Sequence, residues 1–187
     1  MVSARAKTIG MLALLGTLIT GAWSTASART PKQSRASVLR NQLASARKLQ
    51  IARLRAYAEA RQFPRNTYGW GKVNVMIDDD GTICAAANLM VKAGQRALVT
   101  KTAKQNNFLR FADVRSGALM TWMLKSGLTQ EEIAVIQEPY VFDPGDDPAF
   151  EKQEDDRLHT HFINTIDMLE KNTAASLDIA VARLLAA

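Results

Sequence analysis

The chain has 187 residues, of which 24 are Lys or Arg and 18 are Asp or Glu, so its formal net charge is +6. This length fits one ordinary domain that is large enough to bury its own hydrophobic core. Cys84 is the only cysteine, which excludes an intramolecular disulfide.

The first 28 residues have the parts of an export signal in the usual order: two basic residues, an apolar run over 8–23 and an A-x-A pattern at 26–28. A bilayer span needs roughly 20 apolar residues, and this run is shorter. We therefore expect cleavage between Ala28 and Arg29 and an exported protein, periplasmic or extracellular, without a stable membrane span. The alternative is a leader that is retained as an anchor.

The segment after the leader is basic. Residues 29–37 are polar and are expected to form a disordered N-terminus. Residues 38–62 contain no Gly or Pro and predict one basic helix. Its arginines include Arg47 and Arg55, the two candidate binding residues on this helix. Its apolar stripe consists of Leu39, Leu43, Ala46, Ile51, Leu54 and Ala58.

Residues 63–137 are expected to form a compact hairpin-plus-helices unit. Asp-Gly at 80–81 is typical of a tight hairpin turn. Thr129 and Glu132 fit a capping box, in which each side chain binds the backbone N–H of the other residue. The expected elements are a loop (63–71), a hairpin (72–77 and 82–88 around a turn at 78–81), a helix (89–107), a strand (108–114) and two helices (117–126 and from 129).

The C-terminal part predicts an acidic linker over 138–147 and one long helix over 148–185. Asp147 and Pro148 fit an N-cap followed by a first-turn proline. The fold class is therefore α+β and predominantly helical, with a small antiparallel β-hairpin sheet and a long C-terminal helix. The apolar seam of that helix, which predicts helix pairing, consists of Leu158, Phe162, Ile166, Leu169, Thr173, Leu177, Ala180 and Leu184.

Charge is divided unevenly between the two parts of the expected mature chain. Residues 29–72 hold 11 Lys or Arg and one acid, and residues 73–187 hold 11 Lys or Arg and 17 acids. The two parts could attract each other within the chain or between two copies. A basic helix could also bind an acidic partner or an anionic surface.

The segment 127–134 (GLTQEEIA) resembles the turn and the start of the second helix in repressor-type helix-turn-helix DNA-binding domains. That resemblance would imply a recognition helix with basic residues next. The chain instead continues with Val135 to Pro139 and an acidic stretch that would repel phosphates. We expect no nucleic-acid partner, and DNA binding stays an alternative only if the leader is not a true signal.

Residues for catalysis or metal binding are few. His159 and His161, the only histidines, lie about 200° apart on a helix and could not chelate one ion together. Cys84 falls in an expected buried strand, which favours a core thiol. We expect no metal and no cofactor. A small cell-envelope hydrolase using Cys84 or His159 and His161 is the alternative function.

Tyr68 and Trp70, separated by one glycine, could form an exposed stacking platform for a sugar or a peptide. The sequence thus predicts a small exported, non-enzymatic interaction protein that acts through its charged helices. Its candidate binding residues are Tyr68, Trp70, Arg47 and Arg55. Its expected partner is another protein or a second copy of the chain, bound through the C-terminal helix.

Overall fold

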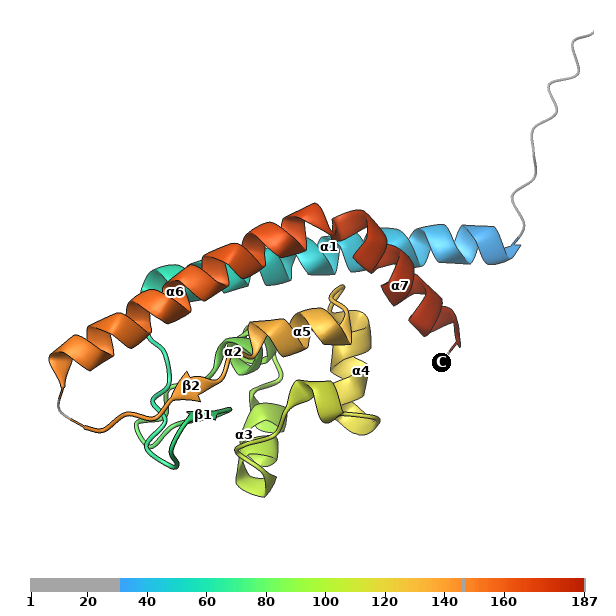
Figure 1. Ribbon diagram of the computed structural model, residues 1–187. Coiled ribbons are helices and arrows are strands. Elements are labelled where there is room, and N and C mark those ends of the chain that lie inside the picture. Colours follow the sequence, from blue (N-terminus) through green and yellow to red (C-terminus); the bar gives the residue numbers. More distant parts are fainter. Residues whose placement is uncertain (1–30, 146, 187) are drawn as a thin grey trace, which may run out of the picture.

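The computed structural model describes residues 31–145 and 147–186. Its helices form two layers (Figure 1). The upper layer contains α1 (Pro31–Ala60), α6 (Pro148–Lys171) and α7 (Thr173–Ala186). The expected leader, residues 1–28, lies outside the described residues. Within 31–145 and 147–186, no helix combines the length and the apolar character that crossing a membrane requires.

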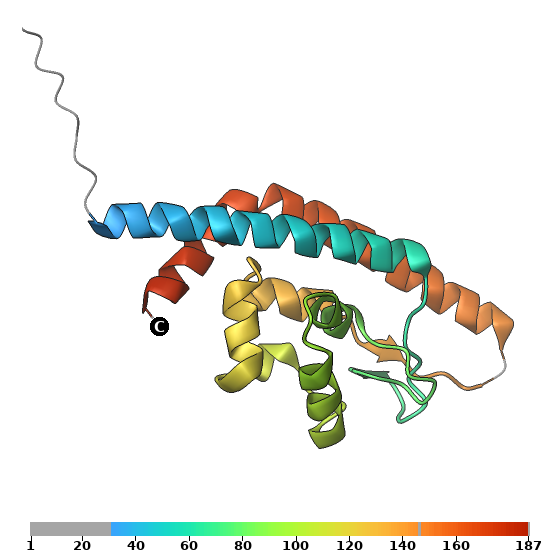
Figure 2. The ribbon, with the colours of Figure 1, turned by 180° about the vertical axis from the view of Figure 1, so that it is seen from behind.

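The lower layer holds shorter elements, as Figures 1 and 2 show from opposite sides. They are α2 (Ala85–Lys92), α3 (Arg96–Gln105), the 3₁₀ helix η1 (Phe111–Asp113), α4 (Gly117–Lys125), α5 (Gln130–Ile136) and the strands β1 (Lys72–Val73) and β2 (Tyr140–Val141). The predicted fold class is therefore confirmed: α+β, mostly helical, with a two-stranded antiparallel sheet.

Helix α1 begins earlier than expected. Residues 31–37 are helical, although the sequence predicted disorder over 29–37. A proline in the first turn is tolerated, because its missing N–H would have no partner there, and no further Gly or Pro interrupts the helix. At about 1.5 Å per residue, these 30 residues span roughly 45 Å.

The predicted C-terminal helix is two helices. Asn172 ends α6, and α7 continues in a different direction from Thr173 (Figure 1). The predicted N-cap is confirmed, because the Asp147 carboxylate accepts hydrogen bonds from the N–H groups of Ala149 and Phe150. Both helices pack along α1, so the partner of the apolar seam is the basic helix of the same chain.

The predicted hairpin is largely wrong. Only a single bridge, Ile77 to Ile83, closes the turn, and β1 instead pairs with the distant β2. The expected return strand becomes α2, because Cys84 is its N-cap and accepts a hydrogen bond from the Ala87 N–H. The alanines that follow it favour a helix.

The remaining short elements agree in part with the sequence. Gly94, at φ +82°, divides the expected helix 89–107 into α2 and α3. The expected strand 108–114 is a loop with η1. The capping box of Thr129 and Glu132 has both of its hydrogen bonds.

The core lies between the two layers. Leu54 from α1 and Phe162 and Ile166 from α6 are fully buried against side chains of α2 and α5. Three rings, those of Tyr57, Phe63 and Phe162, have centroids 5.4 Å apart in each pair. Phe162 and Ile166 of the apolar seam are therefore used inside the monomer.

Candidate binding surfaces

Arg47, predicted as a surface binding residue, is 1% exposed. Its guanidinium forms a bidentate ion pair with Glu132, at 2.7 and 2.8 Å. The other N–H groups donate to Thr173 Oγ1 and to the carbonyls of Gly127 and Leu169. All five donors therefore have acceptors on three other elements, and Arg47 ties α1 to the rest of the fold.

The carboxylate of Glu132 is equally well satisfied. It also accepts from the Ser176 hydroxyl at 2.6 Å and from the Thr129 N–H at 2.8 Å. Burial raises the pKa of Glu132, but the hydrogen bonds from Arg47 and Ser176 outweigh burial and leave this pKa below its ordinary value. Glu132 is thus a buried anion at neutral pH.

Arg55 remains half exposed and pairs with Glu170 of α6 at 2.9 Å. Two more arginines of the basic half bind carboxylates in the same way: Arg40 pairs with Asp178, and Arg61 pairs with Asp156. The charge asymmetry of the chain is therefore largely used inside the monomer. Exposed pairs of this kind contribute little stability each, but they leave these cations less available to a partner.

Tyr68 and Trp70 lie on a loop that one buried side chain holds in place. Asn66 is fully buried, and its amide nitrogen donates to the carbonyls of Gly69 and Tyr140. Its amide oxygen accepts from the N–H groups of Tyr68 and Gly69. The backbone that carries both aromatic residues is therefore fixed against β2.

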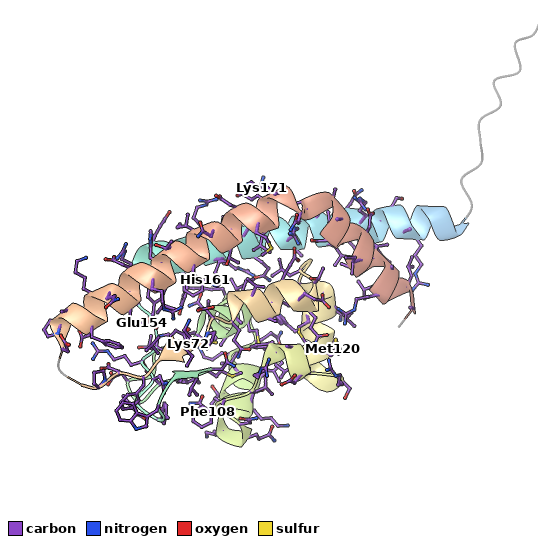
Figure 3. All side chains as sticks on the ribbon, viewed as in Figure 1. Lys72, Phe108, Met120, Glu154, His161 and Lys171 are labelled. Atoms are coloured by element: carbon purple, nitrogen blue, oxygen red, sulfur yellow. The ribbon has the colours of Figure 1, made fainter. Side chains whose placement is uncertain are left out.

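Each of these two rings meets a ring from another segment, and we call the four residues the aromatic surface: Tyr68 with Phe108, and Trp70 with the partly exposed Phe142. Trp70 is 86% exposed and stacks on Phe142, with ring centroids 4.4 Å apart. Tyr68 meets Phe108 edge-on at 5.4 Å. Phe108 lies on the side of the molecule away from α1 and α6 (Figure 3).

Sequence reasoning found the first two members of the aromatic surface and missed the other two. Phe142 reaches Trp70 because β2 pairs with β1, next to the loop. The Tyr68 hydroxyl donates to Asp79 at 2.7 Å. Desolvation and this hydrogen bond raise the pKa of Tyr68 to about 12, so the ring is neutral at physiological pH.

The nucleophile of the hydrolase alternative is buried. Cys84 is fully buried, and burial raises the pKa of its thiol to about 11, so the nucleophilic thiolate is scarce. His161 contacts the Val135 carbonyl at 2.9 Å and lies 3.6 Å from Glu138. Its place on α6 is visible in Figure 3. Over residues 31–145 and 147–186, no three His, Cys, Asp or Glu side chains are grouped to hold a metal ion.

The segment 127–134, which resembles part of a helix-turn-helix, forms the turn at Gly127 that follows α4 and the first residues of α5. After α5 the chain enters β2 rather than a third helix. No protein-family model matches the chain, and no curated protein or solved structure is significantly similar to it. The case for a function therefore depends on this chain's own residues.

Proposed function

We propose that this chain is an exported, non-enzymatic binding protein that engages a protein partner through the aromatic surface. The observation that carries the proposal is Trp70, which is 86% exposed yet held in one place by its loop and by Phe142. Tryptophan and tyrosine are the residues most enriched at the centres of protein interfaces. The leader-like residues 1–28 support export.

A rigid aromatic group favours binding because little conformational entropy is lost when the partner arrives. The loop is already ordered by Asn66, so ordering it costs nothing further. Tyr68, Trp70 and Phe108 are all large apolar side chains left exposed in this part of the fold, as is typical of an interaction surface.

A protein partner is favoured over a sugar by the hydrogen bonding around the rings. Sugar hydroxyls need free acceptors next to the stacking ring. Here both oxygens of Asp79, the carboxylate bound to Tyr68, already accept from Thr67 and Tyr68. Tyr68 and Trp70 then serve as apolar anchors rather than as a polar sugar site.

The test compares Trp70→Ala with Ile179→Ala, which truncates another half-exposed apolar residue on α7. Tagged chains with their leader are crosslinked in intact cells, and the proteins bound to each are quantified by mass spectrometry. We expect one partner to be retained by Ile179→Ala and lost by Trp70→Ala. Loss of a hot-spot tryptophan weakens binding by about 2 kcal/mol or more, roughly thirtyfold.

Partner sets that are the same for Trp70→Ala and the unaltered chain would contradict the proposal. Recovery of glycan fragments instead of a protein would contradict the partner class. Export is tested separately, by the N-terminal residue of the purified native protein. An N-terminus at Arg29 in the periplasm or medium supports it, and a full-length cytoplasmic form overturns it.

A further inference from the structure

A second candidate binding surface lies along α1. Two adjoining cavities, of about 610 and 580 Å³, run along one face of α1 and share Arg53 in their linings. The first lies between α1 and the segment 80–83 with α2, and the second lies between α1 and α4. Figure 2 shows α1 passing above α2 and α4. We call the pair of cavities the α1 groove.

The α1 side of this groove has the residue spacing of a helix-docking seam. Its lining includes Ala46, Leu49, Arg53, Ala56 and Ala60, which follow one another at intervals of three, four, three and four. This is the alternation that lets one helix pack along another. The seam covers about 21 Å, or four turns, at 1.5 Å per residue.

The shape of the groove suits a helix more than a compact ligand. Alanine side chains project little, so the axis of a second helix could approach α1 within the usual 8–10 Å. Leu49 is 56% exposed, and Trp122 forms part of the opposite wall. Leu49 supplies most of the apolar surface for the inner face of such a helix, because Trp122 is only 8% exposed.

Three of the four charged side chains that line the groove are cations without an ion pair, and the fourth is Asp80 of the first cavity. Arg53 stands on α1, and Lys92 and Lys125 stand on the opposite walls. Among the ion pairs of the described residues, none involves these three side chains. Arg55, two positions from Arg53, points to α6 and is paired with Glu170.

We infer that the α1 groove docks an acidic amphipathic helix of about four turns that belongs to a partner protein. Its apolar face would lie on Ala56 and Leu49, and carboxylates along both its edges would meet Arg53 on one wall and the two lysines on the other. Cations on both walls of a groove can form ion pairs with both edges of a rod-shaped ligand that lies in it. A flat anionic membrane would instead need them on one common plane.

This inference is independent of the proposed function. None of the four residues of the aromatic surface lines either cavity. Trp70→Ala therefore leaves helix docking unchanged, and a change in the groove leaves contacts at Trp70 intact. Each proposal can fail without the other.

The test measures binding of a synthetic peptide to the chain without residues 1–28. The probe is a fluorescein-labelled, hydrocarbon-stapled peptide of about four turns, with leucines on one face and glutamates on both flanks. Its binding is followed by fluorescence anisotropy at low and high salt. A peptide in which lysines replace the glutamates and vesicles of phosphatidylglycerol are the comparison probes.

Arg53→Glu and Arg55→Glu form the matched pair of variants, because both reverse one charge of α1 but only Arg53 lines the groove. We expect Arg53→Glu to weaken binding of the acidic peptide at least tenfold and Arg55→Glu to change it less than twofold. Ala56→Trp, a change at an exposed position that fills the groove, should weaken binding as strongly. Circular dichroism confirms that each variant is folded.

Three results would overturn the inference. They are failure of the acidic peptide to bind, equal binding of the lysine peptide, and equal affinity of the Arg53→Glu and Arg55→Glu variants. Vesicles that bind in an Arg53-dependent way while the acidic peptide does not bind would replace the helix by a lipid surface.

Discussion

Arg47→Met should be among the most damaging single substitutions in this fold. Methionine keeps an unbranched apolar stem but removes the guanidinium, and with it both hydrogen bonds to Glu132, which is 6% exposed. The carboxylate would keep only Ser176 and the Thr129 N–H as donors. Removing one member of a buried ion pair typically costs about 3–5 kcal/mol, because the other charge stays buried without compensation.

The assay is urea unfolding followed by circular dichroism, with Arg55→Met as the control. Arg55 and Glu170 form an exposed pair, so that control should lose under about 1 kcal/mol. For a domain of this size, a loss of about 3–5 kcal/mol lowers the melting temperature by roughly 6–20 °C. If Arg47→Met and Arg55→Met have the same stability, the reasoning is refuted.

The pH dependence gives a second check on the same pair. In the native chain the pKa of Glu132 lies below its ordinary value, so its contribution to stability is present above the unfolded pKa and is lost as pH falls through the folded pKa. In Arg47→Met, burial raises the pKa of Glu132 above its unfolded value. The variant's penalty should therefore shrink as pH falls from 7 to 4, and a constant or growing penalty would contradict this account.

Three further predictions concern single positions. Gly127→Ala should lower the free energy of unfolding in urea by about 2 kcal/mol or more, because φ is +78° and the new Cβ would lie 2.2 Å from the Leu43 carbonyl oxygen. The control Gly94→Ala, at φ +82° in open space, should lose only about 1 kcal/mol. Cys84 should react with iodoacetamide at pH 8 only as fast as the chain unfolds, and rapid labelling of the native protein would contradict its burial. Asp147→Ala should cost about 1 kcal/mol through loss of the α6 cap, measured by thermal unfolding, and an unchanged melting temperature would show that the cap is unimportant.

Elements fixed by neighbouring residues could be predicted from the sequence. The capping box at Thr129, the N-cap at Asp147 and the helix stop at Gly127 all depend on contacts within four residues. The predicted hairpin failed for the opposite reason. β1 is completed by β2, more than sixty residues away, and no local pattern specifies that pairing.

The residues of the candidate site also divide into those that local sequence predicts and those that distant elements bring together. The Pro- and Gly-containing loop around Tyr68 and Trp70 predicted exposed aromatic residues, but Phe142 joins them only through β-pairing. Arg47 could have been recognised as buried, because it lies four residues from both Leu43 and Ile51 on the apolar stripe of α1. Its partner Glu132 could not, since two distant helices bring the pair together.

The pairing of so many charges within the monomer changes which surfaces can recognise a partner. If the basic helix acted through its arginines in general, Arg40, Arg55 and Arg61 would first have to leave their carboxylates on α6 and α7. Each such exchange replaces one exposed pair by another and gains little free energy. Arg53 has no carboxylate to leave and holds only a hydrogen bond to Gln50 at 3.3 Å, so a new ion pair there adds to the existing contacts instead of replacing one. Electrostatic recognition by this chain should therefore depend on Arg53 far more than on its net charge.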